Sequence, residues 1–454
     1  MRYEITKTTL KGTTDAPPSK SYTHRAIICA SLANGRSKIT NYLESNDINE
    51  TILTLKKFGI VMEKSDNELN IWGNENLNDV NEGEKIIIDT IKESGSTLRF
   101  LIPVACISKI KKPIIFVRKG RLKDRPVEPL MDALSKLGVL YEISKDRTDD
   151  SELVTIYQGI TGGKTEIPGN ISSQFITGLL FACSRAENDT EINLTTEIES
   201  KSYVEVTLDV LNDFGIKIKV SEDMRKFKIS GNLSYKNREY MVEGDYSSAA
   251  FLLAAGAING DIVVKNLNTN SKQGDREILN ILGSMNAKIE IKENIIHVEK
   301  SNLKGIEIDA KNIPDLVPVC AVLGCFADGE TKIFNAERLR LKESDRLKAI
   351  TQELRKMNAD IEETKDGLII RKSDLKGAEI NPHNDHRIAM SCAIAGLSAE
   401  GKTVINDAEC VNKSYPSFFE DIGRCFHSIS YDLNLSRRYE GIWWVIVSIL
   451  PSTI

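Results

Sequence analysis

Short apolar strands and longer amphipathic stretches alternate through the whole chain. A small or polar turn leads to a β-branched strand, then to a polar segment, and then to a stretch with apolar residues at helical spacing that ends near Gly or Asn. This order predicts a strand, a loop and a helix with one apolar face. The pattern begins six times, at residues 34–63, 112–143, 188–220, 259–291, 328–363 and, in shortened form, 400–423.

A second kind of stretch lies between these starts. There a strand leads into an almost wholly apolar segment rich in Ala, Gly and Cys, at residues 85–108, 164–186, 238–258, 306–327 and 381–399. A helix that is apolar on all sides is expected to be buried, whereas an amphipathic helix covers the outside. The starts are about 70–80 residues apart, too long for common solenoid repeats. We therefore predict an α/β protein of two domains with three units each, divided near Glu243.

Composition excludes several classes of protein. The chain has 454 residues, 41% of them hydrophobic, and a net charge of −5, which fits a globular protein and excludes a general binder of nucleic acid or membrane surfaces. Its eight cysteines show no CxxC spacing, so we expect core residues rather than disulfides or a zinc site. The apolar run at 441–450 is about half as long as a membrane-spanning helix of about 20 residues. A cytoplasmic protein is expected.

Polar residues gather where predicted strands meet predicted helices. In the first half of the chain, Ser, Thr, Gly and cations occupy residues 16–33, 93–100, 120–130 and 169–175. Free N–H groups and the helix dipole make helix N-termini suitable sites for anions. Each segment by itself is equally explained as an ordinary capped helix or a solvated basic turn.

The second half of the chain has its own polar segments. Asp315 precedes an apolar helix and by itself is adequately explained as a helix N-cap. Residues 338–350 are dense in charge, which is usual for a solvated helix face. His386 and Arg387 start another helix, and Lys413 follows late in the chain. His383 and His386 lack the further ligands that a metal would need, so no metal site is predicted.

Taken together and in this order, the motifs resemble the 5-enolpyruvylshikimate-3-phosphate synthase family from about residue 7 to residue 423. The motifs are SKS and HR at 19–25, SGSTLR at 94–99, LKDRP at 122–126, SSQF at 172–175, IPD at 313–315, LKESDR at 341–346 and NDHR at 384–387, with Lys413 last. The resemblance implies a two-domain inside-out α/β barrel of six βαβαββ-type units. It places one domain at 20–242, the other at 1–19 with 243–425, and leaves 426–454 as an atypical tail.

The resemblance also implies a reaction and a set of ligands. The family transfers the enolpyruvyl group of phosphoenolpyruvate to the 5-hydroxyl of shikimate 3-phosphate and releases phosphate through a tetrahedral intermediate, on the route to chorismate and the aromatic amino acids. The implied shikimate 3-phosphate ligands are Lys20, Ser21, Arg25, Ser172, Ser173, Ser200, Tyr203, Asp315 and Lys342. The implied phosphoenolpyruvate ligands are Lys20, Gly95, Arg125, Gln174, Arg346, Arg387 and Lys413.

The resemblance also implies that Lys20, Asp315 and Glu343 transfer protons. We expect Asp315 to act on the hydroxyl, and Glu343 with Lys20 to act on the methylene carbon. No cofactor or metal is expected, and the partners are the two small substrates of a monomer, with no nucleic acid and no membrane. Because the motifs divide between the two domains, we expect closure about hinges near 19–20 and 241–243.

Two residues depart from the family's motifs, and two other functions are alternatives to the one that the resemblance implies. Glu93 stands where many family members carry Asn, and Arg338 stands where some carry Asn. The sister transferase acting on UDP-N-acetylglucosamine uses a Cys in a mobile loop, and the corresponding residues 118–126 contain none. A non-catalytic repeat protein that binds phosphorylated ligands is the other alternative, and the carboxylates Asp315 and Glu343 argue against it.

Overall fold

A computed structural model of the chain describes residues 1–77, 83–108, 111–146 and 149–425. The tail predicted at 426–454 lies outside the described residues. Within the described part, no helix is long and apolar enough to cross a membrane.

The described strands form six small mixed sheets, and four of these share one strand pattern. In each of the four, two parallel strands are followed by two strands joined antiparallel. Their members, in spatial order, are β6 (Ile86–Ile88), β7 (Ile114–Arg118), β9 (Glu152–Gln158) and β8 (Leu140–Lys145); β10 (Gly163–Ile167), β11 (Thr190–Leu194), β13 (Lys226–Ile229) and β12 (Lys219–Val220); β2 (Leu10–Asp15), β16 (Gly260–Lys265), β18 (Ile295–Glu299) and β17 (Lys288–Lys292); and β19 (Glu307–Asp309), β20 (Glu330–Phe334), β22 (Leu368–Arg371) and β21 (Asp360–Glu363).

The other two sheets are variants of the same pattern. In one, β3 (Ala33–Thr40) pairs in parallel with both β14 (Tyr235–Lys236) and β15 (Glu239–Met241), followed by β5 (Glu68–Gly73) and β4 (Val61–Ser65). The last is shorter: β23 (Glu379–Ile380) lies parallel to β24 (Lys402–Ile405), which pairs antiparallel with β1 (Tyr3–Thr6). The α/β class predicted from the alternation is confirmed, and none of the described sheets closes into a barrel.

The helices divide by burial as the apolar patterns predict. An inner set is buried on almost all sides: α1 (Lys20–Leu32), α3 (Gly95–Ala105), α5 (Ser173–Cys183), α7 (Tyr246–Asn259), α9 (Val317–Cys325) and α11 (His386–Gly396). An outer set buries one face: α2 (Asn46–Lys57), α4 (Glu128–Lys136), α6 (Lys201–Asp213), α8 (Ile278–Ser284), α10 (Arg346–Lys356) and α12 (Phe418–Arg424). All eight cysteines are buried and free, as expected for core residues.

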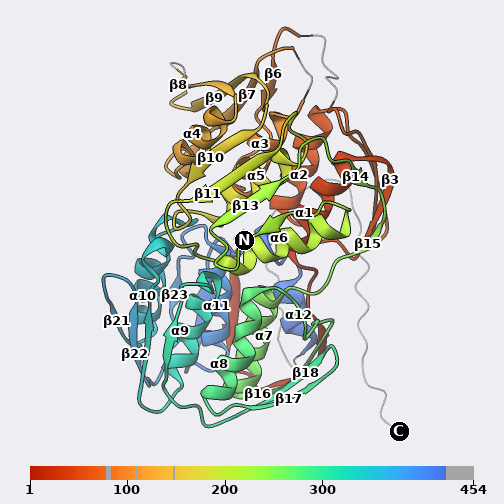
Figure 1. Ribbon diagram of the computed structural model, residues 1–454. Coiled ribbons are helices and arrows are strands. Elements are labelled where there is room, and N and C mark those ends of the chain that lie inside the picture. Colours follow the sequence, from red (N-terminus) through yellow and green to blue (C-terminus); the bar gives the residue numbers. More distant parts are fainter. Residues whose placement is uncertain (78–82, 109–110, 147–148, 426–454) are drawn as a thin grey trace, which may run out of the picture.

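Buried apolar side chains form two separate cores. One core runs from Tyr22 to Val242, and the other combines residues from Ile5 to Ala16 with residues from Tyr246 to Ile422. We call the corresponding parts of the chain the first half and the second half; in Figure 1 they form the upper and lower parts of the molecule. The N-terminal strands β1 and β2 pair within sheets of the second half.

The chain passes between the halves at two places that lie side by side. Pro18 and Gly244 form an isolated β-bridge. The Ser19 N–H donates to the Glu243 carbonyl at 2.8 Å, and the Asp245 N–H donates to the Pro17 carbonyl at 2.7 Å. Both crossings are therefore held together by backbone hydrogen bonds.

Candidate functional site

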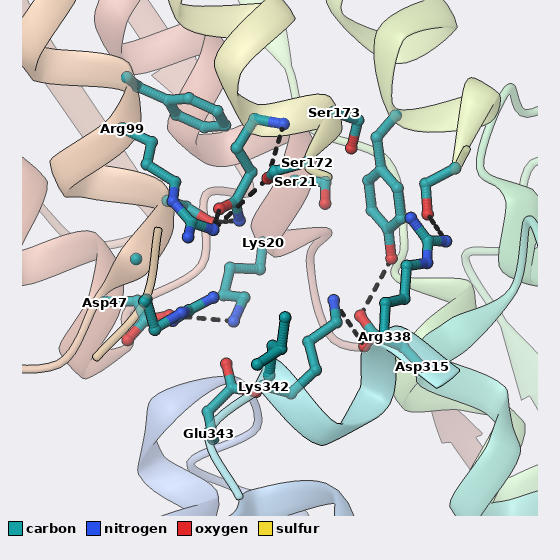
Figure 2. Close-up of a pocket in the computed structure, with 18 of the residues that line it drawn as sticks. Lys20, Ser21, Asp47, Arg99, Ser172, Ser173, Asp315, Arg338, Lys342 and Glu343 are labelled. Atoms are coloured by element: carbon teal, nitrogen blue, oxygen red, sulfur yellow. Dashed lines mark hydrogen bonds and ion pairs between the residues drawn. The ribbon is translucent and has the colours of Figure 1, made fainter. Parts of the chain in front are cut away.

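Side chains from both halves line one cavity. Figure 2 shows Lys20, Ser21, Arg99, Ser172 and Ser173 approaching it from the first half, and Asp315, Arg338, Lys342 and Glu343 approaching it from the second half. The cavity is therefore completed only when the two halves meet.

Three inner helices begin at the cavity. Ser19, Ser94 and Ser172 are their N-cap residues, and the three side chains accept hydrogen bonds from backbone N–H groups in the first turns of α1, α3 and α5. The first residues of these helices line the cavity. Three helix N-termini, each with partial positive charge and free N–H groups, therefore face the same space.

The Arg25 guanidinium on α1 is held by uncharged oxygens. It donates to the Thr207 hydroxyl at 2.8 Å, to the Ser21 carbonyl at 2.8 Å and to the Tyr203 carbonyl at 2.9 Å. The residue is only 2% exposed, and burial lowers its pKa to about 10. Its positive charge is fixed in position, and no carboxylate of the described residues accepts a hydrogen bond from it.

A second cationic group lies where α3 meets α5. The Arg99 guanidinium donates to the Gln174 amide oxygen at 2.9 Å, and the Gln174 amide nitrogen donates to the Ser96 hydroxyl at 2.8 Å. Arg125 is almost buried, and its Nε has no hydrogen-bond partner among the described residues. A Cβ at Gly95 would lie 2.3 Å from Nη1 of Arg125, so a glycine there lets this guanidinium lie directly against the start of α3.

Lys20 is the first residue of α1 and is mostly buried. Its ammonium donates to the Asp47 carboxylate at 3.0 Å, from the start of α2. Asp47 thereby becomes a lining residue that sequence reasoning missed, because no motif surrounds it.

Asp315 lies in the short 3-10 helix η3 (Pro314–Leu316) and caps no helix, so its side chain is free for the cavity. It accepts from Arg346 at 2.5 Å and from the Tyr203 hydroxyl at 3.0 Å, and the Lys342 ammonium lies at 3.9 Å. Burial opposes ionisation of this carboxyl. The charges of Lys342, Arg346 and Arg387 outweigh burial and hold its pKa well below the usual range.

Arg346 connects three carboxylates of the second half. Besides Asp315, its guanidinium donates to Glu343 at 2.8 Å and to Asp385 at 2.8 Å. Burial lowers the pKa of this arginine, but the three carboxylates outweigh it and raise the pKa. Burial likewise opposes ionisation of Glu343, yet Arg346 and Arg125 hold its pKa well below the usual range. The second half therefore presents ionised carboxylates in fixed positions.

Arg338 joins the two halves on the side of the cavity opposite Arg99 and Asp47 (Figure 2). It lies in the 3-10 helix η4 (Glu337–Leu341) and donates to the Ser200 hydroxyl at 2.6 Å and to the Lys311 carbonyl at 2.7 Å. Its Nε lies 3.0 Å from Glu199. Ser200 is in the left-handed conformation, with φ of 53°.

All of the site residues predicted from the sequence line this cavity except Arg387 and Lys413. The Arg387 guanidinium lies behind it, 3.8 Å from Asp315, and donates to the Ser247 carbonyl at 2.9 Å. Lys413 lines two adjoining cavities, where its ammonium lies 2.6 Å from Glu93.

The cavity also contains residues that were not assigned a role. The polar ones are Asp47, Ser96, Arg99, Arg338 and His386, and the apolar ones are Phe100, Pro126, Ile171 and Leu341. Arg99 could have been found, because it lies four residues after Gly95 and so on the same helix face. Burial lowers the pKa of His386 well below its usual range, which keeps the imidazole neutral.

The described residues contain one group of side chains that could bind a metal ion, and it lies outside the cavity. The one group whose ligand atoms lie within 4.8 Å of one another is Asp261, His297 and Glu299, on strands β16 and β18. None of these lines the cavity. Within the cavity, Asp315 and Glu343 are bonded to Arg346, and Asp47 is bonded to Lys20.

Known proteins are similar to this chain over nearly its whole length. The family model of EPSP synthase (3-phosphoshikimate 1-carboxyvinyltransferase) matches residues 5–422. Proteins named 3-phosphoshikimate 1-carboxyvinyltransferase are similar: 47% identical for Methanocaldococcus jannaschii (90% of this chain and 95% of that one) and 45% for Clostridium kluyveri (93% and 96%).

Solved structures show the same similarity in three dimensions. EPSP synthase from Acinetobacter baumannii superimposes with a TM-score of 0.78 at 27% identity, covering 94% of this chain and 98% of that one. The enolpyruvyl transferase NikO from Streptomyces tendae, at 16% identity and a TM-score of 0.75, shares the fold over 93% and 96% of the two chains. On the strength of these matches in sequence and structure, the chain belongs to the EPSP synthase (3-phosphoshikimate 1-carboxyvinyltransferase) family.

Proposed function

We propose that this cavity transfers the enolpyruvyl group of phosphoenolpyruvate to the 5-hydroxyl of shikimate 3-phosphate and releases phosphate. The observation that carries the proposal is the combination of three helix N-termini and fixed cations on one wall with ionised carboxylates on the other. Both substrates carry a phosphate and a carboxylate, and a cavity for two such anions needs many fixed positive groups.

The shikimate 3-phosphate ligands are assigned to the end of the cavity near α5 and α6. Ser172, Ser173 and Ser200 offer hydroxyls there, Lys342 offers an ammonium, and Lys20, Ser21, Arg25, Tyr203 and Asp315 complete the set. Arg338, bonded to Ser200, adds a cation that the motifs did not assign.

The phosphoenolpyruvate ligands are assigned to the end near α3. Arg125 offers a guanidinium whose Nε is unpartnered in the described structure, and Gly95 leaves space for it. Lys20, Gln174, Arg346, Arg387 and Lys413 complete the assigned set. A planar guanidinium suits both the phosphate and the carboxylate of this substrate.

Proton transfer is assigned to Asp315, Glu343 and Lys20. Because Asp315 is ionised and hydrogen-bonded, it is suited to accept the proton of the 5-hydroxyl. Glu343 is ionised beside Arg346 and Arg125. Anions bound at these arginines would weaken that stabilisation and raise the pKa of Glu343, so that it could pass a proton, with Lys20, to the methylene carbon.

The two halves are assigned to two domains, 20–242 and 1–19 with 243–425, each of three βαβαββ-type units in an inside-out α/β barrel. Two separate cores and two adjacent crossings support this division. Since the cavity needs both halves, we expect them to close about these crossings as a substrate binds. One chain supplies both substrate sets, which supports a monomer.

A phosphate-release assay tests the function. The purified protein should release inorganic phosphate when it is given both shikimate 3-phosphate and phosphoenolpyruvate, and release none with either alone. UDP-N-acetylglucosamine replaces shikimate 3-phosphate as the control acceptor. Release with the sugar nucleotide would favour the sister transferase, and no release with either acceptor would favour a binding protein.

A further inference from the structure

Glu93 connects the two halves beside the phosphoenolpyruvate end of the cavity. It lies two residues before α3 in the first half, and its Oε2 is 2.6 Å from the Lys413 ammonium of the second half. Its other oxygen accepts a hydrogen bond from the Asn384 amide at 2.9 Å. Both oxygens of one carboxylate are therefore engaged by groups from the opposite half.

The two partners differ in their contact with solvent. The Lys413 side chain is 7% exposed, whereas that of Glu93 is 47% exposed. Burial raises the pKa of Glu93, but Lys413 and Asn384 outweigh it and the pKa is lowered. Burial lowers the pKa of Lys413, but the neighbouring carboxylates Glu343, Asp47 and Glu93 outweigh it and the pKa is raised. Both groups are thus charged near neutral pH.

The pair also borders two side cavities that adjoin the main one. One is about 280 Å³ and shares Arg125 and Glu343 with the main cavity; the other is about 860 Å³ and shares Asp47 with it. Both side cavities are lined by Glu93, Asn384 and Lys413. An anion that binds between Lys413 and Arg125 therefore lies close to the Glu93 carboxylate.

We propose that Glu93 is a specificity-determining residue that competes with the phosphoenolpyruvate anion for Lys413 and so raises the KM for that substrate alone. The inference rests on the proposed function, in which Lys413 is a phosphoenolpyruvate ligand. An ammonium is a point charge, so a carboxylate in contact with it cancels much of the attraction that it offers to another anion. The same carboxylate repels a bound phosphate directly.

Glu93→Gln tests the competition. Glutamine has nearly the same shape and retains an oxygen for Asn384, but it carries no charge. The KM for phosphoenolpyruvate should fall about threefold to tenfold, while the KM for shikimate 3-phosphate stays within about twofold. A cooperative thermal unfolding transition shows that the variant is folded; Glu93→Asn serves the same test if Glu93→Gln does not fold.

Glu197→Gln is the matched control. Glu197 also joins the halves through a lysine, with its carboxylate 2.8 Å from Lys311, but it lies on the exposed surface and does not line the cavity. This variant should leave both KM values unchanged. The change expected for Glu93→Gln would then reflect Lys413 rather than the loss of any bond between the halves.

Three outcomes would overturn the inference. An unchanged or higher KM for phosphoenolpyruvate in an otherwise active Glu93→Gln enzyme would reject the competition and leave the proposed function standing. Equal shifts of both KM values in both variants would show that the pairs only hold the halves together. A wild-type protein that releases no phosphate from the two substrates would reject the proposed function, and the inference with it.

Discussion

The two walls of the cavity hold their arginines in opposite ways. On the first-half wall, Arg25 donates to the Thr207 hydroxyl and to two backbone carbonyls. On the second-half wall, Arg346 donates to three carboxylates. Burial accordingly lowers the pKa of Arg25 to about 10, whereas the carboxylates overcome burial and raise that of Arg346.

This contrast separates two tasks. A buried cation held only by neutral oxygens retains its attraction for anions, so the first-half wall is suited to bind phosphates and carboxylates. A cation that already faces three carboxylates binds incoming anions less strongly, but it holds all three in place and keeps Asp315 and Glu343 ionised. We infer that the first half contributes most of the anion binding and the second half most of the proton transfer. The largest consequence concerns Asp315.

Asp315→Asn should remove the proposed proton acceptor and leave most of the substrate binding intact. We expect kcat to fall by about 10²–10⁴-fold while the KM for shikimate 3-phosphate changes by less than about tenfold. Steady-state phosphate release measures both. Asp328→Asn, at an exposed aspartate paired with Lys372, is the control and should be fully active. If Asp315→Asn raised KM with little loss of kcat, the second half would be a binding wall as well, and the comparison would fail.

Arg346→Met tests whether the positive charge of Arg346 compensates the three carboxylates of the second-half wall. Removing this cation leaves Asp315, Glu343 and Asp385 buried without it, so the free energy of unfolding should fall by about 3–5 kcal/mol. Urea unfolding measures the change. Lys348→Met, at an exposed residue of the same helix, should change it by less than about 0.5 kcal/mol. If Arg346→Met lowered the free energy of unfolding by no more than this control variant does, the three carboxylates would not depend on the arginine.

Arg125→Lys tests the first-half wall. Lysine keeps the charge but loses the planar fork, so the KM for phosphoenolpyruvate should rise about tenfold, with little change in kcat or in the unfolding free energy. The KM for shikimate 3-phosphate, measured in the same assay, is the internal control and should stay constant. A fall in kcat at constant KM would instead place Arg125 with the groups that stabilise the reaction itself.

Sequence patterns predicted the α/β class and the buried helices because both depend on local order. The stretch that forms α7, for example, has no polar face and is buried on every side. The motifs found the cavity because its residues start helices, and helix starts leave clear signals in Ser, Gly and Asp. The charge-rich run at 338–350 did not reveal where its helix begins. The run divides into η4 and α10, because Asp345 caps a helix that begins only at Arg346.

Contacts between distant segments could not be predicted in this way. The Tyr203 hydroxyl bonds to Asp315 across 112 positions, and Asn384 bonds to Glu93 across 291. The pattern at Asp315 fitted a helix cap, and only the packing of the two halves shows that the side chain faces a cavity instead. Asp47 has no signal of its own, since it becomes a cavity residue only through Lys20. The electrostatic contrast between the walls follows from these long-range contacts.

The smallest expected effect is a pH dependence, and it concerns a cation of the second half that is only partly compensated. Burial outweighs the attraction of Asp315 and lowers the pKa of Lys342 to about 8. If the ammonium binds shikimate 3-phosphate, kcat/KM for that substrate should fall as the pH rises through about 8, by about fivefold between pH 8 and pH 9. Lys342→Arg, which stays charged, should keep a flat profile to about pH 9.

Stability should move in the opposite direction over the same range. The pKa of Lys342 is lower in the folded protein than its ordinary value of 10.5, so between about pH 8 and 10.5 the unfolded chain binds the additional proton. The contribution of this group to stability therefore increases with pH while substrate binding weakens. Activity and urea unfolding measured together at pH 7, 8 and 9 distinguish the two effects. A loss of activity that follows a loss of stability would assign the pH dependence to unfolding and not to this lysine.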